Sequence, residues 1–124
     1  MIHLDANVVL RYLLDDDAVL FQRAVSVIDG PDDLFIANEV LAEIVYVLQK
    51  VYGVERRVVS SRLSSLLARK TVHVPRKKTA LEALGLYAAR NVDIVDALLV
   101  AKHRVEGARV FSFDDRVNRL LNER

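Results

Sequence analysis

The sequence predicts an α/β domain, with a central, mainly parallel sheet of about four to five short strands sandwiched by helices. Short apolar runs alternate along the chain with longer segments whose apolar residues recur at helical spacing. Such alternation is typical of strands that are joined by crossover helices and pair in parallel. The chain shows neither an internal repeat nor a long linker, so we expect a single domain spanning residues 1–124.

The first half of the chain is expected to form two strands, each followed by helical segments. The expected elements are a strand at 2–4, a helical segment through residue 13, a helix at 15–29, a strand at 34–37 and a helix at 38–53. Asn38 is expected to cap the last of these helices, because Asn is a favoured residue at that position. Gly53 is expected to end it, because glycine is common just after a helix.

The second half repeats the pattern of helices and strands. The expected elements are a helix at about 55–69, a strand at 71–74, helices at 77–90 and 93–105, a last strand at 109–113 and a short final helix around 117–121. Gly107 is expected to end the helix before the last strand.

The composition excludes several classes of protein and of site. There is no cysteine, which rules out disulfides, thiolate zinc sites and cysteine nucleophiles. The start MIHLDA lacks the basic segment of a signal peptide. No apolar run approaches the roughly 18–20 residues that span a bilayer. We therefore expect a cytoplasmic protein that is not inserted in a membrane.

Charge is unevenly distributed along the chain. Residues 1–49 carry nine acids and two bases, a balance of −7, whereas residues 50–78 carry nine bases and one acid, a balance of +8. Residues 79–124 carry seven of each. Such a basic block is either a footprint for phosphate groups or a pair of solvated helix faces, and composition alone leaves both open.

Two acids, Asp5 and Asp114, each directly follow an expected strand. Ligands of open parallel sheets bind beside the carboxyl ends of the strands, so both acids are candidate ligand-binding residues. Either could instead cap the helix that follows it. Asp115 is adjacent to Asp114, so position alone does not decide which of the two is the functional acid.

Three further acids lie on expected helices. Glu43 flanks the apolar stripe of its helix, which is also a common place for a surface residue. Asp93 and Asp96 share one helix face, since they are three residues apart. Asp93 reads first as a helix cap. An apolar run follows Asp96, which makes it the better functional candidate.

If these carboxylates converged, they would repel each other. Two unit charges about 4 Å apart cost roughly 4 kcal/mol at an effective dielectric of about 20, so either their pKa values rise or a cation lies among them. An all-oxygen site suits Mg²⁺ or Mn²⁺ rather than zinc. The three histidines are scattered singly, and there is neither a glycine-rich phosphate loop nor a serine nucleophile motif.

Four segments, taken together and in order, resemble the PIN-domain family, and within it the VapC-type toxins of toxin–antitoxin pairs. They are LDANVVLRYLL, EVLAEIVYVLQKVYG, VDIVDALLVA and VFSFDD. The resemblance covers essentially the whole chain. Asp5, Glu43 and Asp96 match the first three acids of the family, and Asp114 matches the acid of its final motif. The remaining matches are Asp93 to an additional acid found in many members, Asn7 to the polar residue two after the first acid, and Ser112 to a position where threonine is usual.

The resemblance implies a divalent-metal-dependent endoribonuclease that binds one or two Mg²⁺ or Mn²⁺ ions. By this reading Asp5, Glu43 and Asp96 are core ligands. Asp114 acts through water or orients the site, and Asp93 is a further possible ligand. Asn7 and Ser112 would support the ligands from the second shell. The RNA-binding candidates are then Arg56, Arg57, Arg62, Arg69 and Lys70.

The resemblance also implies two protein partners, a second copy of the chain in a homodimer and a small cognate antitoxin. Two other functions stay open. The first is a PIN-domain nuclease of RNA processing that has no antitoxin. The second is an RNA-binding or interaction scaffold without catalysis, although retention of every matched acid argues against it.

Overall fold

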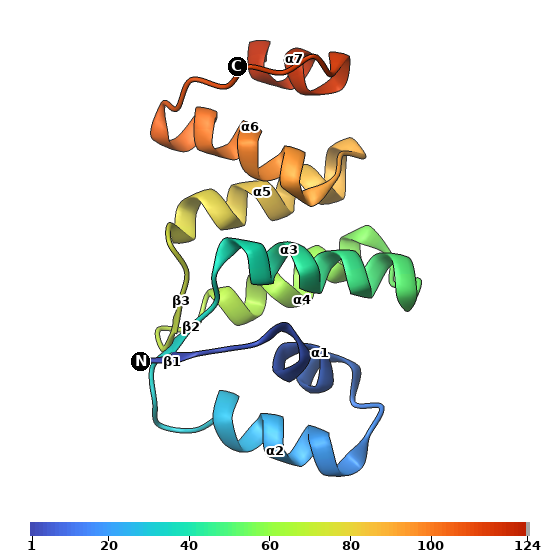
Figure 1. Cartoon of the computed structure of the whole chain (residues 1–124), viewed down its shortest axis with the longest axis vertical. Coiled ribbons are helices and arrows are strands. Elements are labelled where there is room, and N and C mark those ends of the chain that lie inside the picture. Colours follow the sequence, from blue (N-terminus) through green and yellow to red (C-terminus); the bar gives the residue numbers. More distant parts are fainter. Residues whose placement is uncertain (124) are drawn as a thin grey trace.

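Three strands of two residues each form a parallel sheet with the order β1–β2–β3 (Figure 1). They are β1 (Ile2–His3), β2 (Leu34–Phe35) and β3 (Val72–His73). The computed structural model describes residues 1–123, and within that range these are the only strands. The mixed α/β class and the parallel pairing are confirmed, whereas the expectation of four to five strands is wrong.

The missing strand is the one expected at residues 109–113, which is irregular. Its two phenylalanines, Phe111 and Phe113, are 84% and 91% exposed and contact each other edge to face. A strand needs a neighbour that satisfies its backbone groups. This segment joins α6 to α7 at the end of the molecule away from the sheet (Figure 1), so a favourable local sequence finds no partner there.

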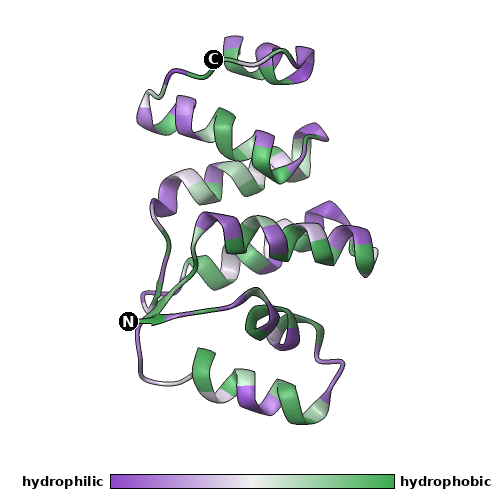
Figure 2. Cartoon of the chain, viewed as in Figure 1, coloured by the Kyte–Doolittle hydropathy of each residue, from purple (hydrophilic) through white to green (hydrophobic). Residues whose placement is uncertain are grey.

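The helices are stacked from α2 at one end of the molecule to α7 at the other (Figure 1). The helical elements are α1 (Ala6–Leu14), α2 (Ala18–Ile28), α3 (Asn38–Tyr46), η1 (Val47–Val51), α4 (Arg56–Leu67), α5 (Lys77–Arg90), α6 (Ile94–Glu106) and α7 (Asp115–Asn122). They pack their apolar sides against one another and against the sheet (Figure 2). No helix within residues 1–123 is long and apolar enough to cross a bilayer.

Local chemistry explains the ends of several helices. The carboxylate of Asp17 accepts a hydrogen bond of 3.0 Å from the backbone N–H of Leu20 and so caps α2. Gly107 ends α6 with a φ of 72°, a left-handed conformation that glycine adopts without strain. The cap expected from Asn38 is wrong, because Ala37 is the residue at the N-cap and Asn38 is the first residue of α3.

The helix expected at 38–53 changes character half-way. From Val47 to Val51 the chain forms the π-helical turn η1, in which the N–H of Tyr52 bonds to the carbonyl of Val47 at 3.2 Å. Gly53 then leaves the helix with a φ of 65°. A π-helical turn is rare and occurs frequently at functional sites, and this one borders the cavity described next.

Candidate active site

Asp5 and Glu43 line one cavity of about 330 Å³, although they lie far apart in the sequence. Asp5 follows β1, and Glu43 lies on α3, which packs beside α1. The cavity is lined by Asp5, Asn7, Leu10, Arg11, Glu43, Val47, Val51 and Tyr52. Two acids and the polar residue Asn7, all singled out in the sequence, therefore share one opening.

Asp5 occupies the N-cap position of α1, but its side chain bonds to none of the helix N–H groups. Its neighbours Leu4 and Ala6 are buried, with exposed fractions of 6% and 1%. These two residues fix the backbone, and the exposed carboxylate of Asp5 is left free at the carboxyl end of β1. The structure therefore does not use Asp5 as a side-chain cap.

A second group of acids lies at the start of α6. Asp96, in the first turn of that helix, is partly buried. Burial raises the pKa of Asp96, and the negative charges of Asp114 and Asp93 raise it further. Repulsion between acids therefore adds to the effect of burial at Asp96.

Asp93 lies at the N-cap of α6, but its side chain makes no capping hydrogen bond. It lines a hollow of about 340 Å³ together with Asp96, Tyr46 and Lys50. Its charge also helps to raise the pKa of Tyr87, for which burial is the larger cause. The expected cap is therefore absent, and the Asp93 carboxylate is exposed beside Asp96.

Asp114 is a cap and a neighbour of Asp96 at once. Its carboxylate accepts hydrogen bonds from the N–H groups of Arg116 and Val117 at 2.8 and 3.1 Å. The hydroxyl of Ser112 accepts a hydrogen bond of 3.0 Å from the N–H of Asp114. Ser112 therefore holds the backbone of Asp114, and its expected role in supporting metal ligands stays a prediction.

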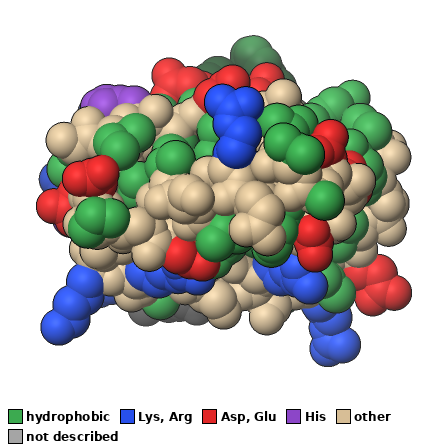
Figure 3. All heavy atoms as spheres, turned by 90° about the horizontal axis from the view of Figure 1, so that it is seen from below, with side chains coloured by type: hydrophobic (Ala, Val, Ile, Leu, Met, Phe, Trp, Pro, Cys, Tyr) green, Lys and Arg blue, Asp and Glu red, His purple; other side chains and the backbone are tan. Residues whose placement is uncertain are grey.

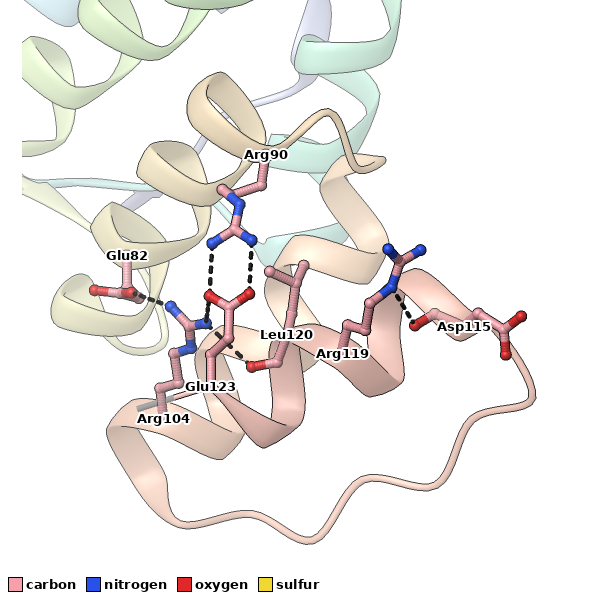
Figure 4. Close-up of polar contacts among 7 residues, drawn as sticks. All are labelled: Glu82, Arg90, Arg104, Asp115, Arg119, Leu120 and Glu123. Atoms are coloured by element: carbon pink, nitrogen blue, oxygen red, sulfur yellow. Dashed lines mark hydrogen bonds and ion pairs between the residues drawn. The ribbon is translucent and has the colours of Figure 1, made fainter.

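The position of Asp114 depends on α7, which ion pairs hold against α5 and α6 (Figure 4). Glu123 accepts two hydrogen bonds of 2.6 Å from Arg90, and Arg104 donates to the carbonyl of Leu120 at 3.1 Å. Figure 4 shows Asp115 at the opposite end of α7 from Glu123, with its carboxylate pointing away from Arg119.

Three of the five expected RNA-binding residues make contacts inside the protein. Arg56 donates to the carbonyls of Tyr87 and Val92 at 2.8 Å each, with its guanidinium over the Tyr87 ring. Arg62 donates to the carbonyl of Leu13 at 2.7 Å, and Arg69 donates to Asp29 and Tyr12. The remaining two, Arg57 and Lys70, are exposed. On the face drawn in Figure 3, Lys and Arg side chains stand apart from one another, between acidic and apolar ones.

The acids thus form two groups, Asp5 with Glu43 and Asp96 with Asp93 and Asp114. Both groups border α3, because the two hollows are lined by neighbouring residues of that helix. Within residues 1–123, no three His, Asp or Glu side chains are close enough together to hold one metal ion. The donors are nevertheless all carboxylates, and the like charges around Asp96 favour a cation nearby. The donor set therefore fits Mg²⁺ or Mn²⁺ in its chemistry.

Two polar residues that line the Asp5–Glu43 cavity were not singled out in the sequence, Arg11 and Tyr52. Arg11 lies one helical turn after Asn7, so the 3.6-residue period could have placed it on the same face. No local pattern points to Tyr52, which reaches the cavity through the π-helical turn.

The PIN domain family matches residues 2–121, nearly the whole chain. The chain belongs to the PIN-domain family. PIN domains are generally nucleases, and they typically bind divalent metals, so membership supports a hydrolase that cleaves nucleic acid. No curated protein and no solved structure shows significant similarity to this PIN domain.

Proposed function

We propose that this PIN domain is a divalent-metal-dependent endoribonuclease and the toxin of a toxin–antitoxin pair. The observation that carries the nuclease proposal is the state of Asp96. Burial raises the pKa of its carboxylate most, and the negative charges of Asp114 and Asp93 raise it further. A fold that gathers like charges at a partly buried acid is suited to holding a cation there.

Asp5, Glu43 and Asp96 would be the core ligands of one or two Mg²⁺ or Mn²⁺ ions, with Asp5 and Glu43 on one side of α3 and Asp96, near Asp93 and Asp114, on the other. When bound, the metal supplies a water molecule of lowered pKa and a positive charge beside the phosphodiester. Asn7, on the same cavity as Asp5, and Ser112, bonded to the backbone of Asp114, would keep the ligands in position.

The protein itself contributes the placement of these acids. The ladder between β1 and β2 fixes the backbone at Asp5, and the cap of α7 fixes Asp114. Lys50, exposed beside Asp93 and Asp96, offers a positive charge to the RNA backbone near the acids. Contacts of this kind add affinity without choosing a base sequence.

The nuclease proposal is tested with purified protein on RNA in Mg²⁺, in Mn²⁺ and in chelator. We expect the wild type to cleave only with metal, and Asp5→Asn and Asp96→Asn to lose about a hundredfold or more in rate, because each removes a charged ligand. Asp32→Asn is the matched control, since Asp32 lies at the amino end of β2, away from the carboxyl ends of the strands. Equal cleavage in chelator, or full activity of both ligand variants, would refute the nuclease proposal.

The toxin role rests on the resemblance of the four sequence segments to VapC-type toxins. It includes a cytoplasmic location, a homodimer and an antitoxin whose C-terminal segment enters the acidic groove with an Arg or Lys. An adjacent small reading frame that encodes a DNA-binding protein is the first thing to seek. Co-purification of its product, together with relief of growth arrest on co-expression, would support the toxin role. A nuclease of RNA processing would show neither.

A further inference from the structure

The acidic cavity of Asp5 and Glu43 contains one positive charge, that of Arg11. Among the described residues that line this cavity, Arg11 is the only cation, and its side chain is 18% exposed. A phosphodiester that approaches two carboxylates is repelled unless a positive group faces it. This inference rests on the nuclease proposal, and it concerns which residue of this chain receives the phosphate.

Two hydrogen bonds hold the Arg11 guanidinium in place, one at each of its two Nη atoms. Nη1 donates to Asp16 at 3.0 Å, and Nη2 donates to the hydroxyl of Tyr52 at 3.1 Å. The ion-pair partner of Arg11 in the described part of the chain is Asp16, which does not line the cavity, and not Asp5 or Glu43. The guanidinium is therefore fixed beside the carboxylates without bonding to them.

The guanidinium also has hydrogen-bonding capacity left over. An arginine has five N–H donors, of which these two contacts use two. The Nε atom of Arg11 is buried and has no partner. Since each Nη atom carries two N–H groups, one N–H of Nη1 and one of Nη2 are left to donate to a ligand, whereas the buried Nε is out of a ligand's reach.

The second holder, Tyr52, belongs to an unusual stretch of backbone. Its N–H closes the π-helical turn by bonding to Val47, and Gly53 follows it with a left-handed φ of 65°. This geometry brings the Tyr52 hydroxyl to Arg11 across 41 positions of sequence. Tyr52 as a whole is 43% exposed and lines the same cavity.

We propose that Arg11 is the phosphate-binding residue of the Asp5–Glu43 cavity, and that Tyr52 is the positioning residue that holds its guanidinium. The planar fork of Arg11 receives an RNA phosphate beside the metal-binding acids. Tyr52 acts only through Arg11.

Binding of a short, labelled, single-stranded RNA, measured by fluorescence anisotropy in chelator, tests this directly because no cleavage intervenes. We expect Arg11→Gln to raise Kd about tenfold or more, as is typical for loss of hydrogen bonds to a charged group. Arg11→Lys keeps the positive charge but lacks the planar guanidinium, so its Kd should lie between the Kd of the wild type and that of Arg11→Gln. Arg23→Gln is the matched control, since Arg23 is exposed on α2 and does not line this cavity.

A double-mutant cycle separates positioning from direct contact. Tyr52→Phe keeps the ring and removes the hydroxyl, and we expect it to raise Kd about threefold in the wild type but not in the Arg11→Gln background. Circular dichroism melting shows that each variant is folded. Equal Kd values for Arg11→Gln and Arg23→Gln, or strictly additive effects of Arg11 and Tyr52, would overturn the proposal.

The same variants distinguish this proposal from the nuclease activity on which it rests. A wild type that cleaves no RNA in Mg²⁺ or Mn²⁺ contradicts the nuclease, while the binding cycle still decides on Arg11. A wild type that cleaves, with kcat/KM unchanged in Arg11→Gln, contradicts the role of Arg11 alone.

Discussion

Burial raises the pKa of Asp96, and the negative charge of Asp114 raises it further, although Asp114 is the N-cap of α7 and Asp96 lies in the first turn of α6. The start of α7 therefore returns to the start of α6 after the chain has run the length of that helix. Arg90 and Glu123 hold α7 in this place. The repulsion between the two acids is set by tertiary packing and not by their neighbours in sequence.

Asp114→Asn should relieve this repulsion without uncapping α7, because an Asn oxygen can still accept from the N–H groups of Arg116 and Val117. We expect the pKa of Asp96 to fall toward its ordinary value. A raised carboxyl pKa costs stability only at pH values where the group is ionised. The metal-free variant should therefore be as stable as the wild type, or up to about 1 kcal/mol more stable, at neutral pH, with no gain below the ordinary pKa.

Carbon-detected NMR titration of Asp96 and thermal unfolding in chelator measure the two effects. Asp115→Asn is the control, because it removes an equal charge one residue away that is not among the causes of the raised pKa of Asp96. A fall in the pKa of Asp96 that is as large in Asp115→Asn as in Asp114→Asn would show that the coupling is not specific to Asp114.

Asp29→Asn should destabilise the protein by about 0.5–1 kcal/mol at neutral pH, a range typical of an exposed ion pair. The Asp29 carboxylate accepts hydrogen bonds from Arg69 at 2.6 Å and from Tyr12 at 2.8 Å, which tie the end of α2 to α1 and to the end of α4. These bonds lower the pKa of Asp29, the one from Arg69 most. The variant thus loses a stabilised carboxylate.

The pH dependence of Asp29 follows from the direction of that shift. A lowered carboxyl pKa adds stability above the pKa of the unfolded chain, near 3.8, and this stability is lost as pH falls through the lower folded value. The gap between wild type and Asp29→Asn in urea unfolding should therefore be constant near neutrality and close in acid. If Asp32→Asn differed from the wild type in stability by the same amount, the effect would come from the loss of a negative charge in general and not from the contacts of Asp29.

Arg56→Ala should lower the free energy of unfolding by about 2 kcal/mol. Arg56 donates hydrogen bonds to two backbone carbonyls, and its guanidinium lies 4.4 Å from the centre of the Tyr87 ring. Its neighbour Arg57 is exposed. Arg57→Ala should leave the midpoint of denaturation within about 0.5 kcal/mol of the wild type. Chemical denaturation of both variants measures this difference, and equal stabilities would contradict an internal role for Arg56.

Two glycines with open space around them should respond in opposite directions to alanine. Gly107 has a φ of 72°, so Gly107→Ala should cost about 1–2 kcal/mol through backbone strain alone. Gly85 lies inside α5 without a positive φ, and Gly85→Ala should stabilise the protein by about 0.5–1 kcal/mol through helix propensity. Thermal unfolding of the pair would contradict this account if both shifts had the same sign.

Local chemistry predicted the features that depend on a few adjacent residues. The left-handed helix ends at Gly53 and Gly107 and the region of the cap near Asp17 are examples, because φ restrictions and capping bonds act within a turn. The strand at 109–113 failed for the opposite reason. Its sequence suits a strand, but a strand exists only where tertiary structure supplies a neighbour.

The sequence supplies candidate members of the site but not their arrangement. Matching acids to a family pattern selected Asp5, Glu43 and Asp96, but a pattern carries no information on which acids share a hollow. The internal use of Arg56 was equally hidden, because its partners, the carbonyls of Tyr87 and Val92, are distant backbone atoms. The π-helical turn that delivers Tyr52 depends on packing around it and leaves no periodic signal.

The two-residue strands also bear on the order in which the protein folds. Each parallel pairing joins segments separated by whole helices, so it forms only after a large loop has closed, at an entropic cost. By contrast α5 and α6 are consecutive in sequence and in contact, separated only by residues 91–93. We expect the Asp93–Asp96 end to be organised early and the Asp5–Glu43 cavity, which needs β1 docked on β2, to be completed last. Pulse-labelled hydrogen exchange would show this order of folding as late protection of the Leu4 amide. The two groups of acids would then come together only after the rest of the chain has folded.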